Sequence, residues 1–137
     1  MPAVTEQAPY GADGEPFPTT YYLTCPRLVA AIARLEAAGG VERWSAELER
    51  DPDLAADLER ATAEQRRLRA ELAAGRVGRD QGSSLELGIG GSANPRRIKC
   101  LHAHAAYALA RPGHLLGERI LAEVEPLWPA HGCCSES

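Results

Sequence analysis

The segment from Asp53 to Ala74 constrains the fold more than any other part of the chain. Its mostly apolar positions recur at alternating steps of four and three residues over nearly three heptads. These positions, which we call the seam, are Leu54, Leu58, Ala61, Gln65, Leu68 and Leu72. This spacing places the side chains on one narrow stripe of a long helix. We expect the seam to pack along the core of the domain; the alternative is a coiled coil with a second copy or with a helical partner.

Two helices are predicted before the seam. The Cys25-Pro26 pair indicates a helix start, because proline is tolerated in the first turn. Apolar residues then recur at helical spacing as far as Gly39-Gly40, a common kind of helix end. A shorter helix over residues 41–50 carries Trp44 and Leu48 on one face.

Two more helices are predicted after the seam. Residues 75–94 are rich in glycine and indicate a flexible connection, since they lack the lysine and hydroxyl residue of a phosphate-binding loop. Asn94-Pro95 favours the start of a long helix, with asparagine as its cap, that stops before Pro112-Gly113. The last helix covers about residues 115–124.

The fold class predicted is mainly α: a small helical domain of about five helices, with one or two short strands near the N-terminal third. Residues 17–23 combine β-branched and aromatic side chains and are the best strand candidate, which we pair with residues 84–89. The helical domain is expected to span residues 17–125. A flexible arm over residues 1–16 and a flexible tail over residues 126–137 would flank it.

Composition narrows the functional classes. A chain of 137 residues fits one domain, and 45% hydrophobic with 25% charged residues is ordinary for a globular protein. The net charge of -4 provides no global field toward nucleic acid or anionic lipid, so neither is an expected partner. The first residues lack the features of a signal peptide, and we expect a cytoplasmic protein with mostly reduced cysteines.

A short stretch containing one cysteine and two histidines is the part of the sequence most suggestive of chemistry. On a helix, residues four apart share a face, so Cys100 and His104 project together while His102 points nearly the opposite way. Cys25, at a predicted helix start, has its thiolate favoured by the helix dipole. Thiolate and imidazole are preferred zinc ligands. We therefore expect a site for zinc or another transition metal; the alternative is that these residues are simply packed in the core. The ligands of the metal site would be Cys25, Cys100 and His104, with His102 or a cysteine of the tail pair Cys133-Cys134 as a fourth ligand.

The same residues also allow a thiol-dependent hydrolase acting on an anionic small molecule. Cys25 or Cys100 would be the nucleophile and His102 or His104 the base. The candidate anion-binding residues are Arg27, Arg96, Arg97 and Lys99. Three of these cations would lie in the first turn of the helix predicted from Asn94. There they oppose the helix dipole unless an anion binds; the alternative is a solvated basic end.

Three segments resemble a bacterial family that is common in actinobacteria and is catalogued as domain of unknown function 501. They are residues 17–28, 32–36 and 98–104, and the resemblance spans roughly residues 15–125. The family carries no established activity to transfer. Its members usually contain a cysteine in the segment that corresponds to residues 1–16, where this chain has none. This departure weakens the expectation of a metal site inherited whole; our hypothesis is that Cys133-Cys134 could substitute for the lost cysteine.

Overall fold

The computed structural model of the chain describes residues 4–94 and 97–124. Over these residues it confirms the mainly helical fold, with five α-helices, two short 3-10 helices and two short strands. None of the described helices combines the length and the hydropathy that a transmembrane segment needs. In chain order the elements are β1 (Val4–Glu6), β2 (Tyr21–Leu23), α1 (Pro26–Ala37), α2 (Gly40–Arg50), α3 (Pro52–Ala73), η1 (Ser83–Glu86), η2 (Ile89–Gly91), α4 (Leu101–Ala110) and α5 (Leu115–Val124).

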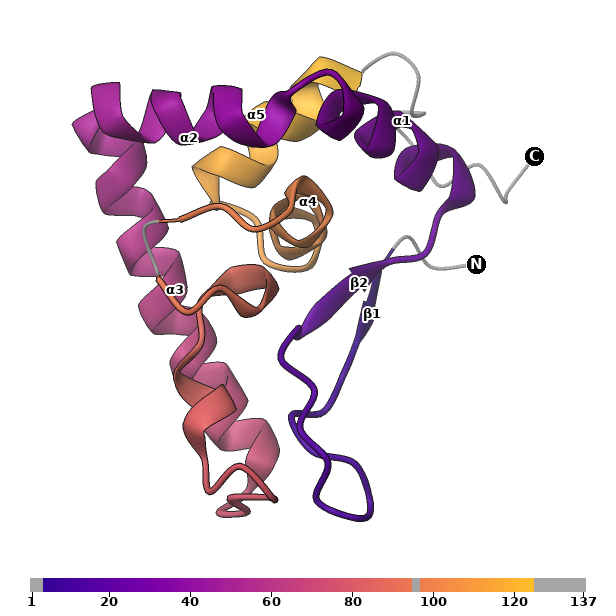
Figure 1. Cartoon of the computed structure of the whole chain (residues 1–137), viewed down its shortest axis with the longest axis vertical. Coiled ribbons are helices and arrows are strands. Elements are labelled where there is room, and N and C mark those ends of the chain that lie inside the picture. Colours follow the sequence, from indigo (N-terminus) through magenta and orange to yellow (C-terminus); the bar gives the residue numbers. More distant parts are fainter. Residues whose placement is uncertain (1–3, 95–96, 125–137) are drawn as a thin grey trace.

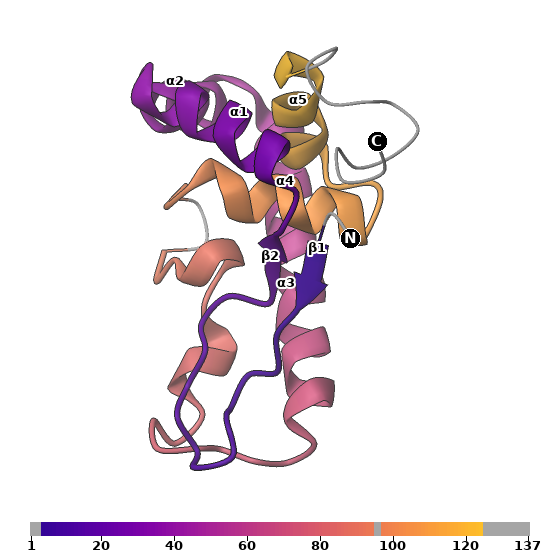
Figure 2. The same ribbon diagram turned by 90° about the vertical axis from the view of Figure 1, so that its right-hand side faces the viewer.

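Helix α4 lies at the centre of the molecule, with α1 and α2 above it, α3 along one side and the β-hairpin on the other (Figure 1). It runs across the direction of α3 (Figure 2). Seven of its ten residues are buried, among them four alanines. These small side chains allow close approach, and at Gly117 of α5 an added Cβ would lie 2.1 Å from the carbonyl oxygen of His104. The core is therefore built around a helix with almost no outward face.

The helices before α4 begin and end close to the residues predicted from the sequence. Pro26 lies in the first turn of α1, and Gly39 adopts a φ of 87° that lets the chain turn into α2. Trp44 and Leu48 are the buried side chains on the inner face of α2, as its periodicity predicted. Asp51 caps α3, because its carboxylate accepts hydrogen bonds from the next two available backbone N–H groups at 3.1 Å.

The seam on α3 faces the core of its own chain. Its first four positions are buried, and the Gln65 amide donates to the carbonyl oxygen of Leu87 at 3.2 Å. One turn further on, the fully buried Arg69 donates to the carbonyl oxygen of Phe17 and to the hydroxyl of Thr20. Because these contacts use the apolar stripe, the seam is not a free surface for a coiled coil.

The N-terminal segment contrasts with the loose arm predicted for residues 1–16. Strand β1 pairs antiparallel with β2, and Tyr10 is buried with its hydroxyl donating to Asp80 at 2.7 Å. The predicted pairing of β2 with residues 84–89 is not observed, since most of that segment forms the two 3-10 helices. A hairpin partner close in sequence costs less chain entropy than a partner sixty residues away. The predicted tail over residues 126–137 lies outside the described residues.

Helix α4 begins at Leu101, so the predicted start at Asn94 is wrong. Cys100 is the residue before the helix and has extended backbone angles. The physical reason is a cap supplied from elsewhere: a carboxylate oxygen of Glu36, on α1, accepts a hydrogen bond from the N–H of Leu101 at 2.7 Å. Asp57, on α3, caps the start of α5 in the same way through the N–H of Leu115. Both late helices are thus started by carboxylates from earlier ones.

Candidate functional site

The two cysteines predicted as zinc ligands lie near opposite ends of α1. Cys25 directly precedes the first turn of that helix and is fully buried in the core. Cys100 neighbours Leu101, whose N–H binds Glu36 near the last turn of α1. The 12 residues of α1 span about 18 Å at 1.5 Å per residue. Burial also raises the pKa of the Cys100 thiol, which favours the thiol over the reactive thiolate.

His102 has both ring nitrogens engaged within the protein. Its Nε2 lies 3.1 Å from the carbonyl oxygen of Val29, and its Nδ1 lies 3.1 Å from a carboxylate oxygen of Glu36. The other oxygen of Glu36 caps α4. His102 therefore ties α4 to α1, and neither nitrogen is directed at an open coordination position.

His104 faces a histidine that sequence reasoning did not pair with it. Its Nδ1 lies 3.0 Å from Nε2 of His114, and both side chains are buried. Desolvation lowers the pKa of His104 to about 3 and that of His114 to about 4, so both rings are neutral at pH 7. A carboxylate oxygen of Asp57 lies 3.7 Å from Nδ1 of His114, and the Tyr107 ring packs edge-on against the His114 ring. The pair is therefore a neutral, water-excluded part of the core.

The four predicted metal ligands do not form one group. Across residues 4–94 and 97–124, no set of three or more histidine, cysteine, aspartate or glutamate side chains is placed to hold a metal ion. Of the predicted anion-binding residues, Arg27 is exposed near the start of α1, whereas Arg97 and Lys99 are exposed just before α4. Arg96 and the pair Cys133-Cys134 lie outside the described residues.

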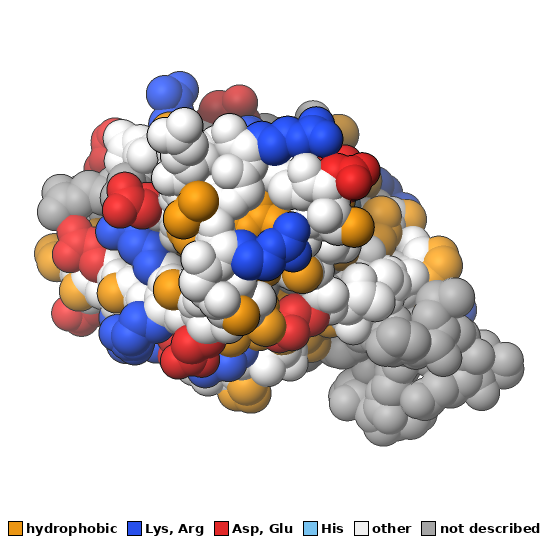
Figure 3. All heavy atoms as spheres, turned by 90° about the horizontal axis from the view of Figure 1, so that it is seen from below, with side chains coloured by type: hydrophobic (Ala, Val, Ile, Leu, Met, Phe, Trp, Pro, Cys, Tyr) orange, Lys and Arg blue, Asp and Glu red, His pale blue; other side chains and the backbone are white. Residues whose placement is uncertain are grey.

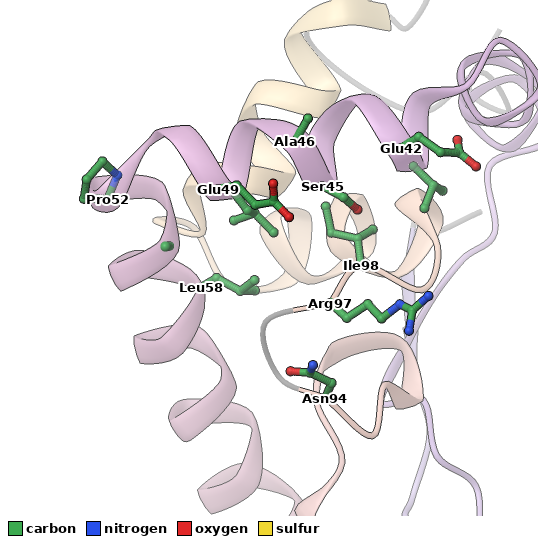
Figure 4. Close-up of a pocket in the computed structure, with 12 residues that line it drawn as sticks. Glu42, Ser45, Ala46, Glu49, Pro52, Leu58, Asn94, Arg97 and Ile98 are labelled. Carbon is green, nitrogen blue, oxygen red and sulfur yellow. The ribbon is translucent and has the colours of Figure 1, made fainter.

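A groove beside α2 has a volume of about 970 Å³. It lies between α2, the first turns of α3 and the segment before α4 (Figure 4). We call it the α2 groove; its lining residues are Val41, Glu42, Ser45, Ala46, Leu48, Glu49, Pro52, Ala55, Leu58, Asn94, Arg97 and Ile98. A cavity of this size is at the upper end of the range for small-ligand sites.

The α2 groove has an apolar floor and charged sides. Leu58 and Ile98 lie at the bottom and are themselves buried, so the apolar surface that a bound molecule meets comes from the more exposed Val41, Pro52 and Ala55 (Figure 4). Glu42 and Glu49 come from α2, and Arg97 reaches in from the opposite side. Among the described residues, no hydrogen bond or ion pair joins the side chains of these three charged residues to another side chain. Both signs of charge are thus available to a bound molecule.

The lower end of the molecule offers a contrast to the groove. Seen from below, positive, negative and apolar side chains alternate over this face without gathering by type (Figure 3). Two arginines between α3 and η1 are bonded within the protein: Arg76 donates to the carbonyl oxygen of Gly11, and Arg79 donates to that of Asp13.

Comparison with family models matches residues 1–122 to the family described as "Protein of unknown function (DUF501)". The chain belongs to the DUF501 family. The match confirms the resemblance drawn from residues 17–28, 32–36 and 98–104. No curated protein and no solved structure shows significant similarity to this chain. Membership of the DUF501 family therefore assigns no ligand or reaction, and functional inference starts from the geometry.

Sequence reasoning missed the α2 groove except for Arg97. A signal was present, because Glu42, Ser45 and Glu49 recur at steps of three and four and therefore line one face of a helix. The interleaving of glutamate with arginine along this segment concealed that face. For His114 no comparable signal exists, since it directly precedes α5 and its partner lies ten residues earlier, on α4.

Proposed function

We propose that this DUF501 protein is a binding module that holds a segment of a partner protein in the α2 groove. The observation that carries the proposal is the pairing of an apolar floor with unpaired charges of both signs on facing walls. A charged side chain that has no partner among the described residues is available for one from another molecule, and it adds specificity to apolar contact.

The composition of the groove favours binding over catalysis. The residues that line it include one hydroxyl group, on Ser45, but no histidine or cysteine. The histidines that the sequence singled out are buried elsewhere, in contacts that join helices. A nucleophile with an adjacent base, which covalent catalysis needs, is therefore not found among the described residues of the groove.

This proposal keeps the helical interaction module predicted from the sequence but moves its surface. The seam was expected to provide that surface, and its first four positions are buried against the core instead. Only Leu58 belongs to both, since its side chain lies on the seam and also at the floor of the groove. The zinc site is not carried forward, because its ligands would have to come from both ends of α1.

Photo-crosslinking in the native host tests the proposal. A benzophenone amino acid replaces Ala46, which is exposed and lines the groove. We expect crosslinks to one discrete segment of a partner, strongly reduced when Glu42 and Glu49 are both changed to lysine. The control places the same probe at Ala33, an exposed residue of α1 away from the groove. A pattern from Ala46 no different from that at Ala33 would refute the proposed function.

A further inference from the structure

We infer that the occupant of the α2 groove is an amphipathic helix carrying two basic residues seven positions apart. The inference rests on the proposed function and specifies its partner. It is carried by the spacing of the two free carboxylates on α2, by the length of the apolar floor and by the sign of the charge on the opposite wall.

The spacing of the carboxylates selects a helix. Glu42 and Glu49 are seven residues apart on one helix, which separates them by about 10.5 Å along its axis. A second helix lying alongside presents residues seven apart at the same distance on one face. An extended strand presents same-face residues at about 6.6 or 13 Å, neither of which matches. Lysine or arginine at such a helical pair would meet both carboxylates at once.

The length and floor of the groove agree with this occupant. The lining residues run along α2 from Val41 to Pro52 at the start of α3, a distance of about 16 Å at the helical rise. Three turns of a helix cover that length. Apolar residues between the two basic positions would lie against Val41, Pro52 and Ala55, above the buried Leu58 and Ile98, as in other grooves that bind helices.

The opposite wall sets the second half of the charge pattern. The Arg97 side chain lies on the opposite side of the groove from α2, so an entirely basic ligand would meet repulsion there (Figure 4). An acidic residue on the other flank of the bound helix removes that conflict. The bound helix would then carry basic residues on one flank, acidic residues on the other and leucine-like residues between them. This is the arrangement that orients paired helices in coiled coils. A small cationic metabolite satisfies only one of the two walls.

Two synthetic helical peptides test the inference on the full-length protein. The first has 18 residues, with leucine at positions 2, 5, 9, 12 and 16, lysine at 6 and 13, glutamate at 8 and 15, and alanine or glutamine elsewhere. The second replaces both lysines with glutamate. We expect the first peptide to bind and to shift the NMR signals of the residues that line the groove. We expect the second to bind at least about fivefold more weakly, because two ion pairs become repulsions.

Matched variants decide whether the charges act as inferred. Glu42→Gln combined with Glu49→Gln should weaken binding of the lysine peptide about fivefold and remove most of its salt dependence. Glu47→Gln, on the same helix but outside the groove, should leave the affinity unchanged. Equal affinity for both peptides, or no effect of the double change, would overturn the inference.

The failure of the inference and the failure of the proposed function give different results. If crosslinks from position 46 lead to a partner segment without two basic residues seven apart, the inference is refuted and the groove still binds a partner. If position 46 gives no discrete crosslink and neither peptide binds, both are refuted. A crosslinked segment with the basic pair, whose peptide binds in the groove, supports both.

Discussion

Lowering the pH from 7.5 to 5.5 should lower the free energy of unfolding by about 2.8 kcal/mol through His104 and His114 alone. Both rings are buried, and desolvation lowers the pKa of His104 to about 3 and of His114 to about 4 from the ordinary value of 6.5. As the pH falls below 6.5, the unfolded chain therefore binds protons that the folded protein does not. Stability is complete above about pH 7 and is lost progressively as the pH falls toward the two folded-state pKa values.

The magnitude follows from the unfolded chain. At pH 5.5, one unit below the pKa of the unfolded chain, each histidine that stays neutral in the folded protein lowers the free energy of unfolding by about 1.4 kcal/mol. At pH 7.5 the same histidine lowers it by almost nothing. The result does not depend on the exact folded values as long as both lie well below 5.5. Buried carboxylates contribute little in this window, because the pKa of a carboxyl group in the unfolded chain is about 4.

Urea unfolding followed by circular dichroism at the two pH values measures the effect. The comparison is between the natural protein and His114→Gln, in which the pH-dependent loss should be smaller by about 1.4 kcal/mol. His102 and His131 are present in both proteins, so their contributions cancel in this difference. An equal loss in the two proteins would refute the claim that His114 is held neutral by burial.

Three further predictions concern packing, capping and metal. Gly117→Ala should lower the free energy of unfolding by about 2 kcal/mol or more, because the new Cβ meets the backbone of His104; an unchanged urea midpoint would contradict the close approach of α4 and α5. Glu36→Ala should lower the free energy of unfolding by about 1–2 kcal/mol, because the cap at Leu101 is lost. Glu36→Gln should lower it less, since an amide oxygen still accepts that hydrogen bond. Thermal unfolding compares the two variants, and equal losses of stability would refute the cap. Protein purified without an affinity tag and dialysed against zinc should retain less than about 0.2 equivalents of zinc by elemental analysis, because the predicted ligands among the described residues do not form one group. One equivalent of bound zinc would contradict this prediction and support the zinc site.

Local signals in the sequence were sufficient for most of the helical framework. Pro26 and Gly39 act within one or two turns of their own positions, so a helix start or stop can be predicted directly from them. The periodicity of α3 likewise predicted which of its sides is buried. It left open whether the covering surface belongs to the same chain, and the structure shows that it does.

Features that depend on distant contacts were not readable in the same way. Asn94-Pro95 is a good local start signal, yet α4 begins at Leu101 because Glu36 supplies the cap there. That shift also removed the argument that Cys100 and His104 share a helical face. The pairing of His104 with His114 depends on the packing of α4 against α5, which no spacing rule encodes.

The contact made by Glu36 changes how the family resemblance itself should be understood. Residues 32–36 and 98–104 help to identify the family, and in the folded chain one carboxylate from the first segment binds both Leu101 and His102 of the second. Two separated stretches that are recognisable together need not mark a shared ligand. Here each supplies what the other requires to keep its shape, so a change in one alters the demands on the other, even though more than sixty positions lie between them.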